Sequence, residues 1–152
     1  MESVESNLIS RLGGVISVQI ASLSSVVWFM KLGRRALVSV IAPSAWQSLP
    51  LVSQKTQTDE SVSDEEGFQV TTSKLTVPLY LSSDADERMV KDYLKYGALL
   101  KVTFASGVTM VYGSKRHPLT GTVRRVSGTR HSESPYHVIE TSSPSEGLLL
   151  EG

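Results

Sequence analysis

Residues 67–81 read Gly-Phe-Gln-Val-Thr-Thr-Ser-Lys-Leu-Thr-Val-Pro-Leu-Tyr-Leu, and the interpretation of the whole chain starts from this stretch. Apolar and polar side chains alternate along it, which is typical of a half-buried strand because successive side chains point to opposite faces. Phe68 and Val70 share one phase, whereas Leu75, Val77 and Leu79 share the other. The phase therefore slips near residues 72–74, and either a β-bulge or two shorter strands would account for the slip.

The segment that follows predicts a short α-helix over about residues 84–96. Ser83 is placed to cap its first turn, and Gly97 is placed to end it in a left-handed conformation. Four apolar residues recur at helical spacing and predict one packed face: Met89, Val90, Tyr93 and Leu94. The helix dipole explains the carboxylates of the first turn without any acid–base role, and these are Asp84, Asp86 and Glu87.

A β-hairpin is predicted after the helix, with Leu100, Val102 and Phe104 alternating towards a turn at Ser106-Gly107. Five further strands are predicted over residues 15–21, 26–30, 36–41, 119–126 and 136–141. On the first of these, Ile16, Val18 and Ile20 are expected to share one face. About seven or eight short strands with one helix indicate a mainly β fold, either a sandwich or a barrel with the short α-helix packed against it.

At 152 residues the chain is expected to form a single domain over residues 1–152. Residues 53–66 are polar and acidic, which predicts a loop within that domain. Residues from 143 onward mix Ser, Pro, Gly and Glu before three leucines, which predicts a mobile C-terminal tail. In the alternative interpretation, the three leucines dock on a neighbour.

Composition excludes several classes of function. The chain has no cysteine, so thiolate chemistry and disulfides are excluded, and its 15 basic residues balance 15 acidic ones. That balance gives no bulk attraction to nucleic acid or to an anionic membrane. The acidic start lacks the basic segment of a signal peptide, and no apolar run reaches the length of a membrane span. We expect a protein made in the cytoplasm with no membrane partner.

No motif in the sequence points to catalysis, to a cofactor or to a metal. The histidines His117, His131 and His137 have no second ligand at a metal-binding spacing. No Gly-x-Ser-x-Gly elbow is present, and Gly13-Gly14 lacks the rest of a phosphate-binding loop. We therefore expect no enzyme. A concave polar pocket that holds a histidine beside a carboxylate would reopen that possibility.

The charges are nevertheless segregated along the chain. The candidate interaction residues on the basic side are Lys115, Arg116, Arg124, Arg125 and Arg130, and those on the acidic side are Asp64, Glu65 and Glu66. Three interpretations stay open, in this order. The groups form a solvated face; or one copy's acidic loop meets the next copy's basic face; or the basic residues contact nucleic acid.

Five stretches give the chain a recognisable layout: Gly-Gly-Val-Ile-Ser-Val-Gln-Ile-Ala at 13–21, the acidic lead into the long strand at 64–78, Ala-Leu-Leu-Lys-Val-Thr-Phe at 98–104, Val-Tyr-Gly-Ser at 111–114 and Pro-Leu at 118–119. Together with the acid-started helix, this layout resembles a group of small proteins encoded in prophage regions of gut bacteria. Trp28-Phe29-Met30 and the Leu-rich tail depart from that pattern.

The resemblance implies a phage structural or tail-assembly role with no catalytic residues. We therefore expect a non-enzymatic structural component of a phage or phage-like particle, in the tail or head–tail assembly, that forms a symmetric homo-oligomer and meets other particle proteins in the virion. Edge strands, the Leu-rich tail and the opposed charge patches are expected to supply the contacts. The alternative is a small β-barrel binding module that contacts nucleic acid or a protein partner through its basic region, residues 115–131.

Overall fold

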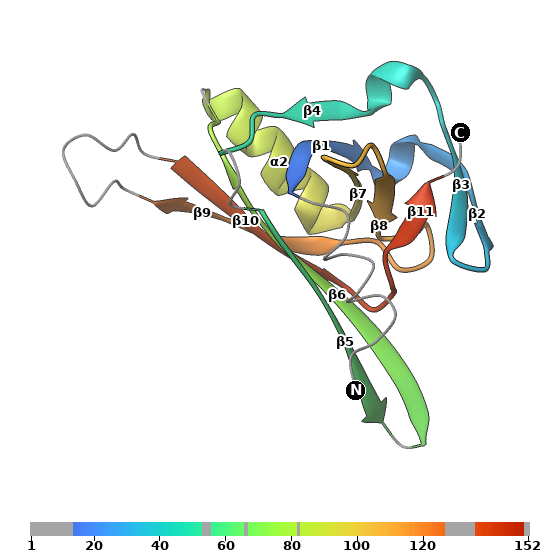
Figure 1. The fold of residues 1–152 in the computed structure, drawn as a ribbon. Coiled ribbons are helices and arrows are strands. Elements are labelled where there is room, and N and C mark those ends of the chain that lie inside the picture. The colour runs from blue at the N-terminus through green and yellow to red at the C-terminus, as the bar shows by residue number, and fades with distance from the viewer. Residues whose placement is uncertain (1–13, 53–55, 66, 82, 127–135, 151–152) are drawn as a thin grey trace.

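The protein is a mainly β fold in which two sheets and one helix enclose a core, as Figure 1 shows. The computed structural model describes residues 14–52, 56–65, 67–81, 83–126 and 136–150. Within these residues, the seven-stranded sheet has the order β2-β3-β11-β8-β7-β1-β4 and the four-stranded sheet has the order β5-β6-β10-β9. The strands of the larger sheet are β1 (Val15–Ser22), β2 (Val26–Leu32), β3 (Arg35–Val40), β4 (Gln47–Leu49), β7 (Ala98–Phe104), β8 (Thr109–Tyr112) and β11 (Leu148–Leu150), and those of the smaller sheet are β5 (Gln57–Glu65), β6 (Phe68–Leu79), β9 (Thr120–Val126) and β10 (Tyr136–Ser143). The prediction of a mainly β fold with one short helix is confirmed, and of the two architectures left open, sandwich or barrel, the two sheets are consistent with the sandwich.

Both sheets and the helix α2 (Asp84–Tyr96) contribute to one hydrophobic core. Leu100 and Val102 of β7 lie in it together with Leu75 of β6 and Leu94 of α2, and none of these four side chains is exposed. α2 packs against β9 and β1, and so it closes one side of the sandwich (Figure 1). A smaller apolar cluster includes Leu99 and lies on the opposite face of the larger sheet, because neighbouring residues of a strand point to opposite faces.

The helix begins and ends where the sequence predicts. The Ser83 hydroxyl accepts a hydrogen bond from the Asp86 N–H at 3.1 Å, which satisfies one of the free amides of the first turn. At the other end Gly97 has a φ of 111°, and its N–H donates to the Tyr93 carbonyl at 2.9 Å. Within the described ranges, no helix has the length and apolar character needed to cross a membrane.

The hairpin of β7 and β8 is also confirmed. Leu100 pairs with Tyr112 and Val102 with Met110, and Gly107 in the connection has a φ of 91°. A positive φ of this kind suits glycine because it has no Cβ to clash with the backbone. β7 is buried along almost its whole length because it lies inside the larger sheet, between β8 and β1.

Three strands were missed, so the predicted seven or eight strands are eleven in the described residues. β4 is only three residues long, and β11 falls in the segment predicted as a mobile tail. β11 is instead held between β8, with antiparallel pairing, and β3, with parallel pairing. Leu148 is buried there, so the tail prediction is wrong for residues 148–150, whose leucines complete the sheet.

The prediction of a loop over residues 53–66 is wrong for most of that range. Residues 57–65 form β5, which pairs with β6 from Gln57 opposite Thr76 to Glu65 opposite Phe68. Backbone hydrogen bonds to a neighbouring strand hold β5 in place, and they require no apolar side chains. The sequence of residues 57–65 is polar and shows no apolar periodicity, so it did not predict the strand β5, which its pairing with β6 stabilises.

The predicted slip within β6 is absent. Its pairing with β5 and with β10 runs without a register shift, so neither a bulge nor a break interrupts it. The pairing with β10 covers only residues 73–79 of β6, and beyond that point β5 and β6 continue as a ribbon of two strands. Since no sandwich core lies along that part, nothing forces the alternation of residues 68–72 to match the rest of the strand.

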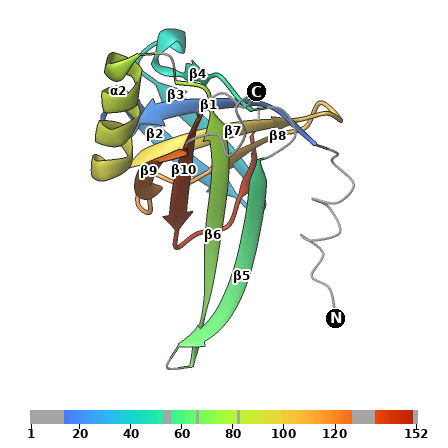
Figure 2. The same cartoon turned by 90° about the vertical axis from the view of Figure 1, so that its left-hand side faces the viewer.

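We call residues 61–65 of β5 and 67–72, which include the start of β6, the acidic arm. In Figures 1 and 2 this end of the β5–β6 hairpin projects away from the body of the protein. Val62 on the arm is 57% exposed. An isolated ribbon of two strands is marginally stable in water, so an additional contact would stabilise the arm.

Ile16 does not share a face with Val18 and Ile20. It is 62% exposed, because the pairing of β1 with β7 shifts register between Val15 and Ser17. One extra residue at such a shift moves a side chain to the other face of the sheet.

Candidate functional site: a basic pocket beside β2

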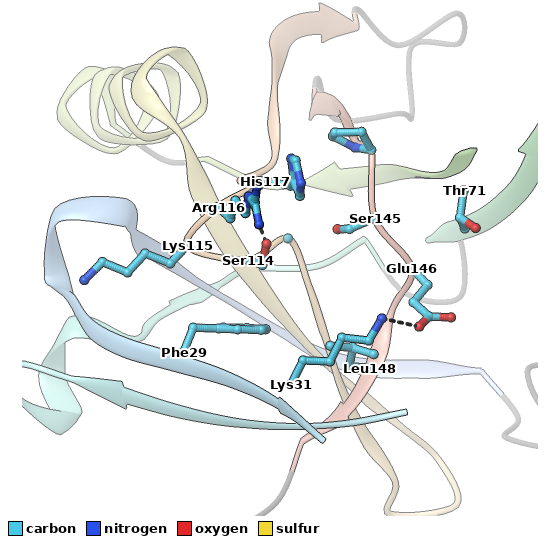
Figure 3. A pocket seen from close by; sticks show the side chains of 12 residues that line it. Phe29, Lys31, Thr71, Ser114, Lys115, Arg116, His117, Ser145, Glu146 and Leu148 are labelled. Carbon is cyan, nitrogen blue, oxygen red and sulfur yellow. Dashed lines mark hydrogen bonds and ion pairs between the residues drawn. The ribbon is translucent and has the colours of Figure 1, made fainter. Parts of the chain in front are cut away.

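An open pocket of about 790 Å³ lies where β2, the loop at 113–117 and the segment at 144–148 meet. Figure 3 shows its side chains. The charged and aromatic residues of the lining are Phe29, Lys31, Lys115, Arg116, His117 and Glu146. We call it the basic pocket. Thr71, at the base of the acidic arm, lies on its margin.

The loop on one side of the pocket is a tight turn fixed by its own hydrogen bonds. The Ser114 N–H donates to the His117 carbonyl at 3.0 Å, and the Ser114 hydroxyl accepts from the His117 N–H at 2.9 Å. Gly113 begins the turn with a φ of 87°, and a Cβ there would lie 3.0 Å from the Ala98 carbonyl oxygen. The turn thus presents residues 115–117 to solvent on a defined backbone.

Lys115 ties this loop to β2. Its Nζ donates to the Val27 carbonyl at 2.9 Å. The pairing of β2 with β3 shifts register between Val26 and Trp28, so Val27 is the extra residue of an irregular ladder. A bulge leaves its extra residue unpaired, and the lysine supplies a donor for that residue's carbonyl.

Three serines connect the four-stranded sheet to the same loop. The Ser143 hydroxyl donates to the His117 carbonyl at 2.8 Å, and it lies 2.8 Å from the Ser145 hydroxyl, which must therefore donate to it. The Ser73 hydroxyl donates to the Ser145 carbonyl. Ser73 and Ser143 are buried, so these bonds satisfy groups that have no access to water. They hold the two walls of the pocket together.

The pocket carries an excess of positive charge. Lys31 and Glu146 form an ion pair at 2.9 Å and offset one another. Lys115 and Arg116 are exposed, and neither forms a salt bridge with a described carboxylate. Lysine and arginine bind carboxylates and phosphates through charge-assisted hydrogen bonds. The arrangement is therefore suited to holding an acidic group.

The other predicted basic residues lie elsewhere. Arg124 and Arg125 are four and five residues into β9, which puts Arg124 about 13 Å along the strand from Thr120. Arg124 pairs with Glu140 at 3.1 Å, and Arg125 pairs with Glu87 at 2.9 Å. The structure therefore brings Lys115 and Arg116 together and separates them from these two arginines. Arg130 and Glu66 lie outside the described residues, and Asp64 and Glu65 belong to β5 in the acidic arm.

Glu87 has a structural role beyond the helix dipole that the sequence analysis assigned to it. Its carboxylate lies between Arg125, Lys91 at 3.1 Å and the Nε2 of His137 at 3.6 Å, and its side chain is only 9% exposed. The hydrogen bond from Arg125, followed by that from Lys91, lowers the pKa of Glu87 from 4.5 to about 2. The cluster joins α2 to β9 and β10. Three of its members come from different elements, so helical spacing gave no signal for it.

The sequence analysis named a polar pocket with a histidine beside a carboxylate as the sign of an enzyme. Two histidine–carboxylate pairs meet that description only in part. His117 and Glu146 line the same pocket, but the Glu146 carboxylate is engaged by Lys31. His137 and Glu87 are close, but both side chains are largely buried in the cluster described above. In the described part of the chain, no three acidic or histidine side chains gather as metal ligands. His131 lies outside the described residues.

Sequence reasoning missed half of the basic pocket. Lys31 lies just beyond the strand predicted at residues 26–30, and Glu146 fell in the predicted mobile tail. Their pairing depends on β11, which brings residues 144–148 against β2. Comparison with protein-family models, with curated proteins and with solved structures finds no match to this chain.

Proposed function

We propose that the protein is a non-enzymatic structural component of a phage or phage-like particle, and that it works by symmetric self-assembly. Copies of the chain meet along the edge of the larger sheet at β2, and the assembled oligomer contacts other particle proteins. The proposal takes its biological setting from the resemblance to prophage-encoded proteins described above. It takes its physical basis from the surface of β2.

The observation that carries the proposal is the uncovered apolar edge. β2 is the terminal strand of its sheet, and four of its apolar side chains are exposed: Val27 by 51%, Trp28 by 44%, Met30 by 48% and Leu32 by 51%. Natural proteins shield edge strands with charges, prolines or covering segments, because an open apolar edge pairs with other chains. β2 has one lysine and no proline. An edge of this kind is maintained where a second strand covers it.

A second copy of the chain is the occupant that the proposal names. Identical copies that each bear an apolar edge bury it by association, and closed point-group symmetry limits the size of the product. The Leu-rich segment, which was expected to contribute to the contacts, is used within the larger sheet and is left out of the proposal. The alternative, contact with nucleic acid or a protein partner through residues 115–131, rests on Lys115 and Arg116, since Arg124 and Arg125 are paired with Glu140 and Glu87.

The test is the solution mass of the purified protein over a concentration series, by sedimentation velocity. The wild type is expected to form a discrete oligomer or a growing polymer. The double substitution Trp28→Glu with Met30→Glu places charge on the edge and is expected to leave a folded monomer. Tyr80→Gln with Tyr96→Gln is the control, because these aromatic residues are also exposed but belong to other elements, Tyr80 following β6 and Tyr96 ending α2.

The control variant should assemble as the wild type does. A wild-type protein that stays monomeric at high concentration, and that is missing from particles purified from cells producing a tagged copy, would refute the proposal. Circular dichroism of each variant establishes that the fold is retained, so that a loss of assembly is read as a loss of contact.

A further inference from the structure

We propose that the basic pocket binds a nucleoside monophosphate. The turn formed by residues 114–117 holds the phosphate group, and the base packs on the ring of Phe29. This inference goes beyond the proposed function, because a site for a small molecule does not depend on self-assembly. It follows from the donors of the turn, from their fixed positions and from the aromatic surface on the other side of the pocket.

The turn supplies donors for a single phosphate group. Among the described residues, the Arg116 guanidinium forms no hydrogen bond or ion pair, and the Lys115 ammonium uses only one of its N–H groups, on the Val27 carbonyl. The backbone N–H groups of Lys115 and Arg116 also have no acceptor in the part of the chain that the structure describes. Successive N–H groups in a turn bind anions, and a phosphate monoester offers three acceptor oxygens and a strong negative charge.

These donors are fixed before any ligand binds. Two hydrogen bonds between Ser114 and His117 close the turn, and the Ser143 hydroxyl ties the His117 carbonyl to the four-stranded sheet. The bond to Val27 anchors the Lys115 side chain on β2, two residues before Phe29. A preformed site loses little conformational entropy on binding, so even an open pocket gains affinity from this arrangement.

The other side of the pocket is suited to a flat organic group. Figure 3 shows Phe29 and Lys31 on one side, with Ser114 and Arg116 across from them. A half-buried aromatic ring in a cavity lining offers a stacking surface for a planar base. The volume of about 790 Å³ lies within the range of about 300–1,000 Å³ that small-molecule sites occupy. Inorganic phosphate would leave most of this space and the ring unused, which favours a nucleotide.

The experiment is isothermal titration calorimetry of the full-length chain with three probes: adenosine monophosphate, adenosine and inorganic phosphate. Adenosine monophosphate is expected to bind, because it makes both contacts. Adenosine and inorganic phosphate are each expected to bind at least about tenfold more weakly, since each makes only one of them. High salt should weaken the binding of adenosine monophosphate, because the phosphate contacts are made by exposed charges.

The phosphate contact is tested by Arg116→Ala, which is expected to weaken the binding of adenosine monophosphate about tenfold or more through the loss of a charge-assisted hydrogen bond. Arg116 is exposed, so the substitution leaves the fold intact. Arg88→Ala is the matched control and should bind as the wild type does. It also removes one exposed guanidinium, but from α2 and outside the lining of the basic pocket.

The base contact is tested by Phe29→Leu, which keeps an apolar side chain but removes the ring. Binding of adenosine monophosphate is expected to weaken about threefold or more, whereas binding of inorganic phosphate should stay unchanged. Phe29 and its neighbours Trp28 and Met30 point to opposite faces of β2, so this variant should also self-associate as the wild type does.

Each outcome supports or refutes the inference. No binding of adenosine monophosphate, or equal binding by the wild type and Arg116→Ala, would refute it. Inorganic phosphate bound as tightly as adenosine monophosphate would show that the base is not recognised, which also refutes a nucleotide site. A wild type that stays monomeric but binds the nucleotide would leave this inference standing while the proposed function fails, and an assembling protein without nucleotide affinity would show the reverse.

Discussion

Two strands of the larger sheet, β7 and β2, have seven residues each and similar apolar character, but opposite surroundings. β7 reads Ala-Leu-Leu-Lys-Val-Thr-Phe and is buried at five positions, whereas β2 reads Val-Val-Trp-Phe-Met-Lys-Leu and is buried at one. β7 lies inside the sheet between two strands, and β2 ends the sheet. The contrast teaches that apolar side chains favour burial, but that a strand is buried only where neighbouring elements of the fold cover it. The apolar surface left over on β2 is what we assign to another copy.

The largest loss of stability is expected from substitutions in the hydrophobic core. Leu100→Ala in β7 removes a side chain with no exposure from the main core, so the free energy of unfolding should fall by about 2–5 kcal/mol. Urea denaturation of the wild type and the variant at neutral pH measures the difference. A loss below about 1 kcal/mol would contradict the close-packed environment that the comparison assigns to β7.

The space around the backbone also differs between Gly121 in β9 and Gly14. A Cβ at Gly121 in β9 would collide with the Glu140 carbonyl oxygen of β10, whereas a Cβ at Gly14 meets nothing. Gly121→Ala should therefore cost about 1–3 kcal/mol through displaced strands. Gly14→Ala is the matched control and should change stability by less than about 0.5 kcal/mol. Equal midpoints of thermal unfolding for the two variants would mean that β9 and β10 can move apart to admit a Cβ at Gly121 without loss of stability.

The position of a carboxylate in the fold also affects its pKa, as Glu87 shows. Glu87, which is largely buried, has a pKa of about 2 instead of 4.5, and it is faced by Asp84 and Lys91 from α2, Arg125 from β9 and His137 from β10. A lowered pKa in the folded state stabilises the fold above pH 4.5, and this stabilisation is lost as the pH falls from 4.5 to about 2.

Glu87→Gln should therefore flatten the acid limb of the stability profile, measured by urea denaturation between about pH 2 and pH 6. Glu140→Gln is the matched control, because that carboxylate pairs with Arg124 but is 52% exposed. Exposed pairs contribute little, so the control should keep nearly the full wild-type slope. If the free energy of unfolding of all three proteins changed equally with pH, Glu87 would not contribute to the loss of stability in acid.

The smallest effect on stability is expected at the edge. Leu32→Ala in β2 is chemically the same change as Leu100→Ala, but Leu32 is 51% exposed, so unfolding of the isolated chain should change by less than about 0.5 kcal/mol. Its effect should appear instead as weaker self-association in sedimentation experiments. A large loss of stability in the monomer would mean that β2 is covered within its own chain.

Sequence reasoning succeeded where apolar periodicity and end signals coincide. Ser83, Gly97 and the apolar face of α2 fixed the helix, and alternation about Gly107 fixed the β7–β8 hairpin. It failed where backbone hydrogen bonds, and not apolar side chains, stabilise an element: β5 has few apolar residues and is held by its pairing with β6. It also failed where distant segments meet, since Lys31 and Glu146 become neighbours only through β11.

The candidate site shows the same division. Lys115 and Arg116 were predicted together because they are adjacent in the chain, and the structure keeps them together on one turn. Arg124 and Arg125 were grouped with them by proximity in sequence, yet adjacent residues of a strand point to opposite faces, and each arginine pairs with a different glutamate. In this chain, adjacent basic residues stay together on the surface in the turn at 114–117 and are separated in the strand β9.

The position of β11 also orders events during synthesis. The β2–β3 hairpin precedes most of the other strands along the chain, but it is joined to the rest of its sheet through β11, which follows all of them. Until Leu148–Leu150 leave the ribosome, β3 has one open side and the hairpin has no fixed place in the sheet. A nascent or prematurely terminated chain therefore does not present the edge of β2 on a finished sheet. The larger sheet is therefore complete only once β11 has formed between β3 and β8.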